Sequence, residues 1–233
     1  MICKELIDLT HPLHEGVPTW SGRCGFRLEI RLDYDQGLRV HSFKSHAGIG
    51  THMDAPSHFI PGGLNIDQIP LEHLLAPACV LDLREFAGPD FLVELRYVES
   101  YEKKYGPIPA GAVVIAFTGW DRYWNQPEKY RNPDKTGKMH FPGFSAACAE
   151  ALSQRPIAGI GIDTLSPDGA NKGFPVHLAM LGAGKYILEN LAALERMPAK
   201  GAFILSLPIP LVGASESGIR AIALAFSDNP KIC

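Results

Sequence analysis

The residues best suited to chemistry lie in one short segment rich in histidine and glycine. Residues 45–59 read SHAGIGTHMDAPSHF. The spacing of His52 and Asp54 places both side chains on one side of an extended backbone, before Pro56 bends the chain. An imidazole beside a carboxylate suits Zn²⁺ or another first-row ion with a position left open for water. The segment therefore predicts a metal site at His52 and Asp54, with His58 placed to handle the proton of that water.

A purely structural interpretation of these residues is also open. A single histidine on a strand usually packs in the core or meets a backbone partner. That interpretation leaves Gly48, Gly50 and Pro56 unexplained, whereas a metal site uses them: glycines allow close backbone approach, and a proline fixes the direction of exit. The clustering therefore favours the metal site.

Composition limits the possible functions. The chain has 233 residues, 46% of them hydrophobic and 20% charged, so it can bury a core as one domain over residues 1–233. Its net charge of -3 gives no broad basic face, and nucleic acid is not an expected partner. The N-terminal MICKELIDLT lacks an apolar signal core, and no apolar run is long enough to span a bilayer. We therefore expect a cytoplasmic protein without a membrane partner.

The five cysteines are scattered without a C-x-x-C pair. They indicate free thiols in a reducing compartment, not a disulfide framework or a thiolate metal cage. Cys3 and Cys79 lie beside or within apolar segments and are predicted to pack in the core.

Hydrophobic patterning predicts an α/β protein. Apolar and charged residues alternate over residues 26–32, as in a strand with one exposed face. A turn follows, and residues 38–46 can pair with this strand, so a hairpin is predicted. Short apolar runs bounded by glycine or proline predict buried strands at 79–83, 113–117, 158–162, 202–207 and 219–226. Helices are expected at 97–105, 145–153 and 186–196, and a long surface loop at 125–143. The fold class is thus a mixed β-sheet or barrel-like core with flanking helices.

A family resemblance rests on the histidine segment. GTHMDAPSH resembles the H-x-G-T-H-x-D-x-P-x-H signature of the cyclase family of metal-dependent hydrolases, which includes kynurenine formamidases and isatin hydrolases. DLTHPLHEGVPTWSG, GIDTLSPD and YILENL extend the likeness over most of the chain. It implies a swivelling β/β/α fold, one or two ions of zinc or manganese, and a homodimer or homotetramer.

The resemblance also implies roles for individual residues. His52 and Asp54 would be metal ligands, His58 the catalytic acid-base, and His177 and Glu189 the pair that completes a two-metal site. Asp54 and Glu189 would bridge the ions. From the residues alone, Glu189 is expected in the first turns of a helix and His177 on a glycine-rich loop. The structural alternatives are that Glu189 is a solvated helix residue and that His177 is an ordinary loop residue, neither of them binding metal.

One position departs from the family. The kynurenine formamidases have a further histidine four residues before the ligand that corresponds to His52, and this chain has Gly48 there. His46 is the nearest substitute, and a glycine bulge would be needed to bring it to the metal. The sequence leaves open whether it binds.

Trp20 in VPTWSG resembles the aromatic wall of the family's substrate pocket, and a core position is the open alternative. Together, the histidine segment and the family resemblance predict a metal-dependent amide hydrolase in which His58 passes the proton of an activated water to the leaving nitrogen. The leading substrate class is an aryl formamide such as N-formylkynurenine. The alternatives are a cyclic amide such as isatin and a non-catalytic, metal-stabilised binding protein. His140 has no assigned role, and GASESG and GAGK are expected to be turns.

Overall fold

The computed structural model describes residues 2–227 and is built around a closed mixed β-barrel. Eight strands follow the order β1-β12-β11-β5-β7-β9-β10-β4. Because β12 also pairs with β4, all of these strands except β1 close into a barrel. These strands are β1 (Ile2–Asp8), β4 (His52–Asp54), β5 (Leu75–Asp82), β7 (Val113–Phe117), β9 (Gly159–Ile162), β10 (Tyr186–Glu189), β11 (Ala202–Pro208) and β12 (Glu216–Ser227). The neighbours β5, β7, β9 and β10 are parallel, whereas the other pairs are antiparallel.

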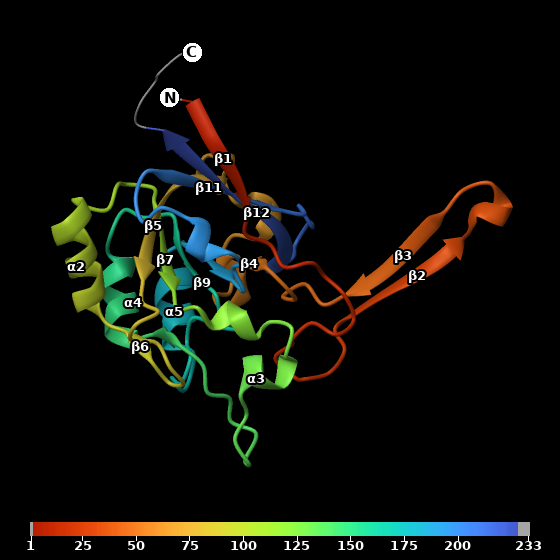
Figure 1. Ribbon diagram of the computed structural model, residues 1–233, viewed down its shortest axis with the longest axis horizontal. Helices are drawn as coiled ribbons and strands as arrows, with labels where there is room; N and C mark the ends of the chain where they lie inside the picture. The colour runs from red at the N-terminus through yellow and green to blue at the C-terminus, as the bar shows by residue number, and fades with distance from the viewer. Residues whose placement is uncertain (1, 228–233) are drawn as a thin grey trace.

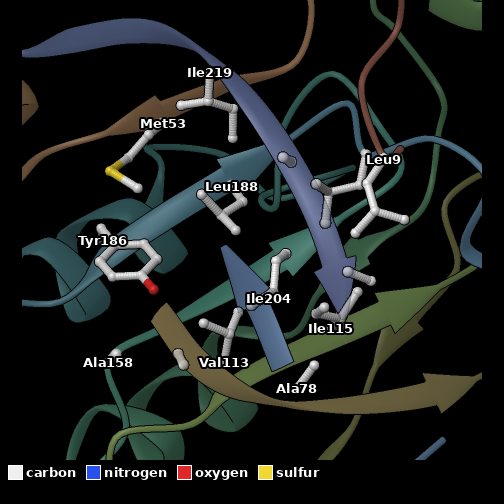
Figure 2. Close-up of a cluster of buried hydrophobic side chains, with 14 of the residues drawn as sticks. Leu9, Met53, Ala78, Val113, Ile115, Ala158, Tyr186, Leu188, Ile204 and Ile219 are labelled. Atoms are coloured by element: carbon white, nitrogen blue, oxygen red, sulfur yellow. The ribbon is translucent and has the colours of Figure 1, made fainter. Parts of the chain in front are cut away.

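The apolar runs that form β7 and β9 are buried on both faces. In β7, Val113 and Ile115 point into the barrel, where they meet Leu188 and Ile204 (Figure 2). The intervening Val114 belongs to a second cluster outside the barrel. Alternation of this kind between two cores gives the continuous apolar sequence that predicted these strands.

Helices cover the outer face of the parallel strands (Figure 1). They are α2 (Leu95–Tyr105), α4 (Ala146–Ser153) and α5 (Pro175–Gly182), and the shorter α1 (Leu71–Leu74) and α3 (Pro127–Arg131) lie elsewhere on the chain. Ser145 caps α4 by accepting a hydrogen bond from the Cys148 amide. No helix in the part of the chain that the structure describes is long and apolar enough to cross a membrane.

The predicted hairpin projects from the barrel as an arm (Figure 1). It consists of β2 (Phe26–Leu32) and β3 (Val40–Ser45), which pair antiparallel as a separate two-stranded sheet. A further two-stranded sheet joins β6 (Leu92–Val93) to β8 (Gly143–Phe144). The resulting fold agrees with the predicted barrel-like core and flanking helices.

The predicted helix over 186–196 is wrong. Residues Tyr186–Glu189 form β10 between β9 and β4, and only Leu194–Arg196 form a short 3-10 helix. Asn190 has a φ of 54°, which turns the chain at the end of the strand. The stripe of Ile187, Leu191 and Leu194 is buried by neighbouring strands, and this tertiary packing overrides the helical spacing.

Three smaller predictions also need correction. His177 lies in α5, not on a loop, because Pro175 starts a helix there. Cys3 is exposed, whereas Cys79 is buried as predicted. The segment 125–143 is more than a surface loop, since it contains α3 and buries Tyr130 and Phe141 in an aromatic cluster.

Candidate metal centre

Strand β4 gathers the candidate ligands because it lies between β10 and β12. In the strand register His52 is opposite Glu189 of β10, and Asp54 is opposite Glu216 of β12. Directly opposed residues share a face of the sheet, as do residues two apart on one strand. The four side chains therefore converge outside the barrel, while Met53 between them points into its core.

The two imidazoles present the same nitrogen to the centre. The Nδ1 atom of His52 lies 2.9 Å from the carbonyl oxygen of Gly50, which can only accept a hydrogen bond, so Nδ1 carries the proton. Nδ1 of His177 lies 2.5 Å from Oδ2 of the buried Asp168. In both residues Nε2 is left to face the carboxylates, which is the orientation a metal ligand needs.

Asp54 and Glu189 each offer one oxygen to each histidine. Nε2 of His52 lies 3.4 Å from Asp54 Oδ1 and 3.3 Å from Glu189 Oε2. Nε2 of His177 lies 3.5 Å from Asp54 Oδ2 and 3.4 Å from Glu189 Oε1. Ligands about 2.0–2.1 Å from a tetrahedral ion are about 3.3–3.4 Å from one another. The spacing thus fits divalent ions held between these groups.

Asp54 gives an independent test of this fit. Its side chain is 1% exposed, and within residues 2–227 neither carboxylate oxygen has a hydrogen-bond partner. A buried carboxylate without such partners is costly unless a cation compensates it. The oxygens and imidazole nitrogens around it are ligands that zinc and manganese accept. The residues present therefore fit a metal site.

Burial and charge shift the pKa values of His52, Asp54 and Glu189. Burial is the largest single influence on His52 and would lower its pKa, but the charges of Asp54 and Glu189 and the hydrogen bonds to Asp54 and the Gly50 carbonyl together raise that pKa to about 10. For Asp54, burial opposes ionisation, and the nearby imidazoles still hold its pKa below the ordinary value. Burial and then the charge of Asp54 raise the pKa of Glu189 to about 7. In the absence of an ion, protons therefore compensate the carboxylates.

His58 stands at the rim of the cluster. It ends the 3-10 helix Pro56–His58, which follows β4 after Pro56 turns the chain. Its side chain is 28% exposed, and Nδ1 lies 3.4 Å from Oε2 of Glu216. Its ring centre is 5.8 Å from that of His177. His58 is thus close enough to serve a reacting group at the centre while remaining open to the pocket.

A pocket of about 330 Å³ opens above these groups. Trp20 lines it and is 50% exposed, so the alternative of a core tryptophan is wrong. Phe174 lies 6.0 Å from Trp20 and 5.4 Å from Phe59 between ring centres. The three rings form an aromatic wall beside the cluster. Trp120 and Trp124, by contrast, are buried in the aromatic cluster under α3.

His46 and His140, whose roles the sequence leaves undecided, both lie away from the candidate metal centre. The ring of His46 packs against Gly25 and lines a separate cavity at the base of the hairpin. Among the described residues it joins no group of candidate metal ligands, so the bulge that would bring it to the centre is not formed. His140 bonds Asp90 across 2.6 Å and lies 3.4 Å from Asp134, which ties its loop to the body of the protein.

Four residues of the site were missed by sequence reasoning. Phe174 had no signal beyond its type, and Asn190, which donates to the Gly50 carbonyl, lay inside the wrongly predicted helix. Asp168 was within the quoted GIDTLSPD but received no role. Glu216 lay in a segment expected to be a turn, and only the pairing of β12 with β4 brings it to Asp54.

The barrel and its buried cluster define a metal-dependent hydrolase. The chain belongs to the Cyclase family, whose description is "Putative cyclase" and which matches residues 7–169. It is 34% identical to the isatin hydrolase of Roseibium aggregatum over 187 residues, which cover 75% of this chain and 70% of that protein. It is 25% identical to the kynurenine formamidase of Erythrobacter litoralis, covering 97% and 96% of the two chains.

Solved structures agree with this assignment. Isatin hydrolase A from Ralstonia solanacearum superposes with a TM-score of 0.87 at 32% identity, covering 95% of this chain and 92% of that one. An isatin hydrolase bound to the product analogue thioisatinate gives a TM-score of 0.89 at 28% identity, covering 96% and 93%. The chain is thus an amide hydrolase of this family, and the alternative of a non-catalytic binding protein is set aside.

Proposed function

We propose that the protein hydrolyses a cyclic amide fused to an aryl ring, of the isatin type, with divalent zinc or manganese held by His52, Asp54, His177 and Glu189. The observation that carries this proposal is the direct opening of the buried ligand cluster into a pocket walled by Trp20 and other aromatic rings. Aromatic walls suit a flat ring, and the cluster lies where the ring's carbonyl would be held.

Each part of the site has a separate task. A bound divalent ion would lower the pKa of water towards neutrality and polarise the amide carbonyl. Trp20, Phe59 and Phe174 hold the aryl ring and exclude bulk water from one side of it. His58 accepts the proton of the attacking water and delivers it to the leaving nitrogen, for which its exposed position at the rim leaves room.

A cyclic amide is favoured over the aryl formamide that led the sequence-based expectation. The isatin hydrolase of Roseibium aggregatum shares 34% identity with this chain, against 25% for the kynurenine formamidase of Erythrobacter litoralis. The isatin hydrolase bound to thioisatinate also superposes with a TM-score of 0.89. Aryl formamide hydrolysis is the second candidate, supported by the near-complete coverage of both chains in the formamidase match.

The test is a substrate comparison on protein of known metal content. Protein freed of metal with a chelator is reloaded with Zn²⁺ or Mn²⁺, and ring opening of isatin is measured beside hydrolysis of N-formylkynurenine. We expect activity only after reloading, with a higher kcat/KM for isatin. Activity that survives complete metal removal contradicts the proposed chemistry, and a higher kcat/KM for the formamide reverses the order of the substrates.

Two further properties belong to this proposal. We propose a homodimer or homotetramer, supported by the projecting hairpin, whose apolar side chains Leu28, Ile30 and Phe43 are all more than half exposed. We also propose a cytoplasmic location, since exposed free thiols at Cys3 and Cys24 suit a reducing compartment.

A further inference from the structure

The carboxylate of Glu216 occupies the space next to Gly48, the position at which this chain lacks the histidine of the kynurenine formamidases. We infer that Glu216 is a metal ligand that takes the place of that histidine, and that Gly48 has no side chain because Glu216 fills its space. This inference rests on the proposed metal-dependent function and adds a residue that the signature does not contain.

Geometry groups Glu216 with two residues of the signature. Single ligand atoms of His52, Asp54 and Glu216 all lie within 4.8 Å of one another. The same holds for Asp54, His177 and Glu189, so Asp54 is common to two groups of three. Two ions would then share Asp54 as a ligand, the first in the group of Glu216 and the second in the group of His177. Without Glu216, the first ion would have only His52 and Asp54 as ligands of its own group.

Backbone pairing fixes the position of Glu216. It begins β12 directly opposite Asp54 of β4, and the amide of Ala55 donates to the carbonyl of Ser215 beside it. Two antiparallel strands hold opposed side chains about 4.5–5.5 Å apart at their Cβ atoms, within reach of a shared ion. Its side chain is 25% exposed, which leaves the carboxylate accessible from the pocket.

Gly48 and Glu216 exclude each other's side chains. A Cβ atom built on Gly48 would overlap Oε1 of Glu216 and come within 3.3 Å of Nε2 of His52. A side chain at position 48 would therefore enter the space where a ligand to the first ion must lie. The absence of a side chain at Gly48 therefore leaves the space in which the Glu216 carboxylate can reach the ion.

Glu216 also faces His58, so the competing explanation is that its carboxylate positions His58 and does not bind metal. Its Oε2 lies 3.4 Å from Nδ1 of His58, while its Oε1 is directed to Gly48. If the carboxylate only positioned His58, its removal would change turnover and leave metal binding intact. If it is a ligand, its removal must weaken the binding of one ion. The two roles are separated by measuring bound metal directly.

The exchange of an imidazole for a carboxylate has a consequence for metal preference. Imidazole suits zinc, whereas carboxylate oxygen suits manganese and other hard ions. The group of His52, Asp54 and Glu216 has two carboxylates and one imidazole. We therefore expect this half of the site to favour Mn²⁺ more strongly than the same half rebuilt with a histidine at position 48.

The experiment measures metal per chain and the affinity of each ion by chelator competition, with Mn²⁺ and with Zn²⁺. The variants are Glu216→Ala, Glu216→Gly, and Gly48→His combined with Glu216→Gly; Glu99→Ala on the exposed face of α2 is the matched control. Circular dichroism and thermal melting of the metal-free proteins establish that each variant folds.

We expect two ions per chain in the wild type and in the control. Glu216→Ala and Glu216→Gly should keep the second ion and bind the first at least about 10- to 100-fold more weakly, since losing even an outer-shell partner costs that much. Adding Gly48→His to Glu216→Gly should restore the first ion and shift its preference from Mn²⁺ towards Zn²⁺. That rescue is an outcome that a role in positioning His58 does not produce.

Two results overturn the inference. If Glu216→Ala binds two ions with wild-type affinity, Glu216 is not a ligand, whatever happens to turnover, and the metal-dependent function stands. If the Glu216 variants lose an ion that Gly48→His does not restore, the exchange between the two positions is wrong. A wild-type protein that binds no divalent ion defeats the proposed function itself, which is a distinct outcome.

Discussion

The Nδ1 atom of His177 lies 2.5 Å from Oδ2 of Asp168, and the other oxygen of Asp168 accepts a hydrogen bond of 2.8 Å from the amide of Val176. One buried carboxylate thereby holds the first turn of α5 and the ring of a candidate metal ligand. It fixes the proton of His177 on Nδ1 and aims Nε2 at Asp54 and Glu189.

Replacing Asp168 with asparagine should weaken metal binding without unfolding the protein. The amide has the same shape but no charge, so it holds the imidazole less firmly and makes it a poorer ligand. We expect affinity for one ion to fall by about 10- to 100-fold, as measured by chelator competition. Asp134→Asn is the control, because Asp134 lies in the exposed loop near His140. Wild-type metal affinity in Asp168→Asn would show that the contact does not orient the ligand.

Replacing His58 with alanine should separate chemistry from metal binding. His58 is outside both groups of candidate ligands among the described residues, and its side chain faces the pocket. Loss of a general acid-base costs about 10²- to 10⁴-fold in rate. We expect kcat to fall by that range while metal content per chain stays at the wild-type value. Full activity in His58→Ala would remove it from the mechanism.

The sequence predicted the barrel better than it predicted the site. Residues 113–117 are a strand because a short apolar run bounded by glycine is buried on both faces, and this pattern is local. The helical spacing of Ile187, Leu191 and Leu194 predicts a helix that would include residues 186–189. Only the pairing with β9 and β4 decides for a strand, and no local pattern contains it.

The candidate ligands divide in the same way. His52 and Asp54 are two apart on one strand, so the sequence alone places them together. Glu216 is 162 residues beyond Asp54 (216 − 54), and its position depends on the register between β12 and β4. Asp168 acts through α5, a helix that the sequence pattern does not predict. Residues that act across strands or through an unrecognised helix are therefore the ones that sequence reasoning missed.

Binding of a divalent ion should release protons. In the metal-free protein, burial would lower the pKa of His52, but the charges of Asp54 and Glu189 and the hydrogen bonds to the ring together raise it to about 10. The pKa of His177 is raised well above its ordinary value despite burial, mainly through its bond to Asp168. Both imidazoles therefore hold a proton at pH 7, which an ion must displace from Nε2.

The sign of the pH dependence follows from this competition. Raising the pH removes the competing protons, so apparent metal affinity should rise with pH through the neutral range and level off above the pKa of about 10. Calorimetric titration in buffers of different ionisation enthalpy should detect more than one proton released per chain at pH 7. Heats of binding that do not depend on the buffer would contradict this expectation.

The projecting hairpin of β2 and β3 has an exposed apolar face. Leu28 of β2 is directly opposite Phe43 of β3, and Ile30 lies two residues along from Leu28 on the same face. These three side chains are exposed by 51%, 62% and 53%. An isolated two-stranded hairpin is only marginally stable in water, and an exposed apolar face of this kind marks an interface. We therefore expect the arm to pack against another copy of the chain.

Light scattering after gel filtration measures the assembly directly. The wild type should be a dimer or tetramer, and Ile30→Asp combined with Phe43→Asp should shift it to monomer, because buried charges without partners oppose association. Arg27→Ala is the matched control, since Arg27 alternates with Phe26 and Leu28 and faces the opposite side of the hairpin. If the double variant keeps the wild-type mass, the apolar face of the arm does not hold the copies together. Because the hairpin leads directly into the segment of Gly48 and His52, a monomeric variant that also binds metal more weakly would show that assembly supports the centre.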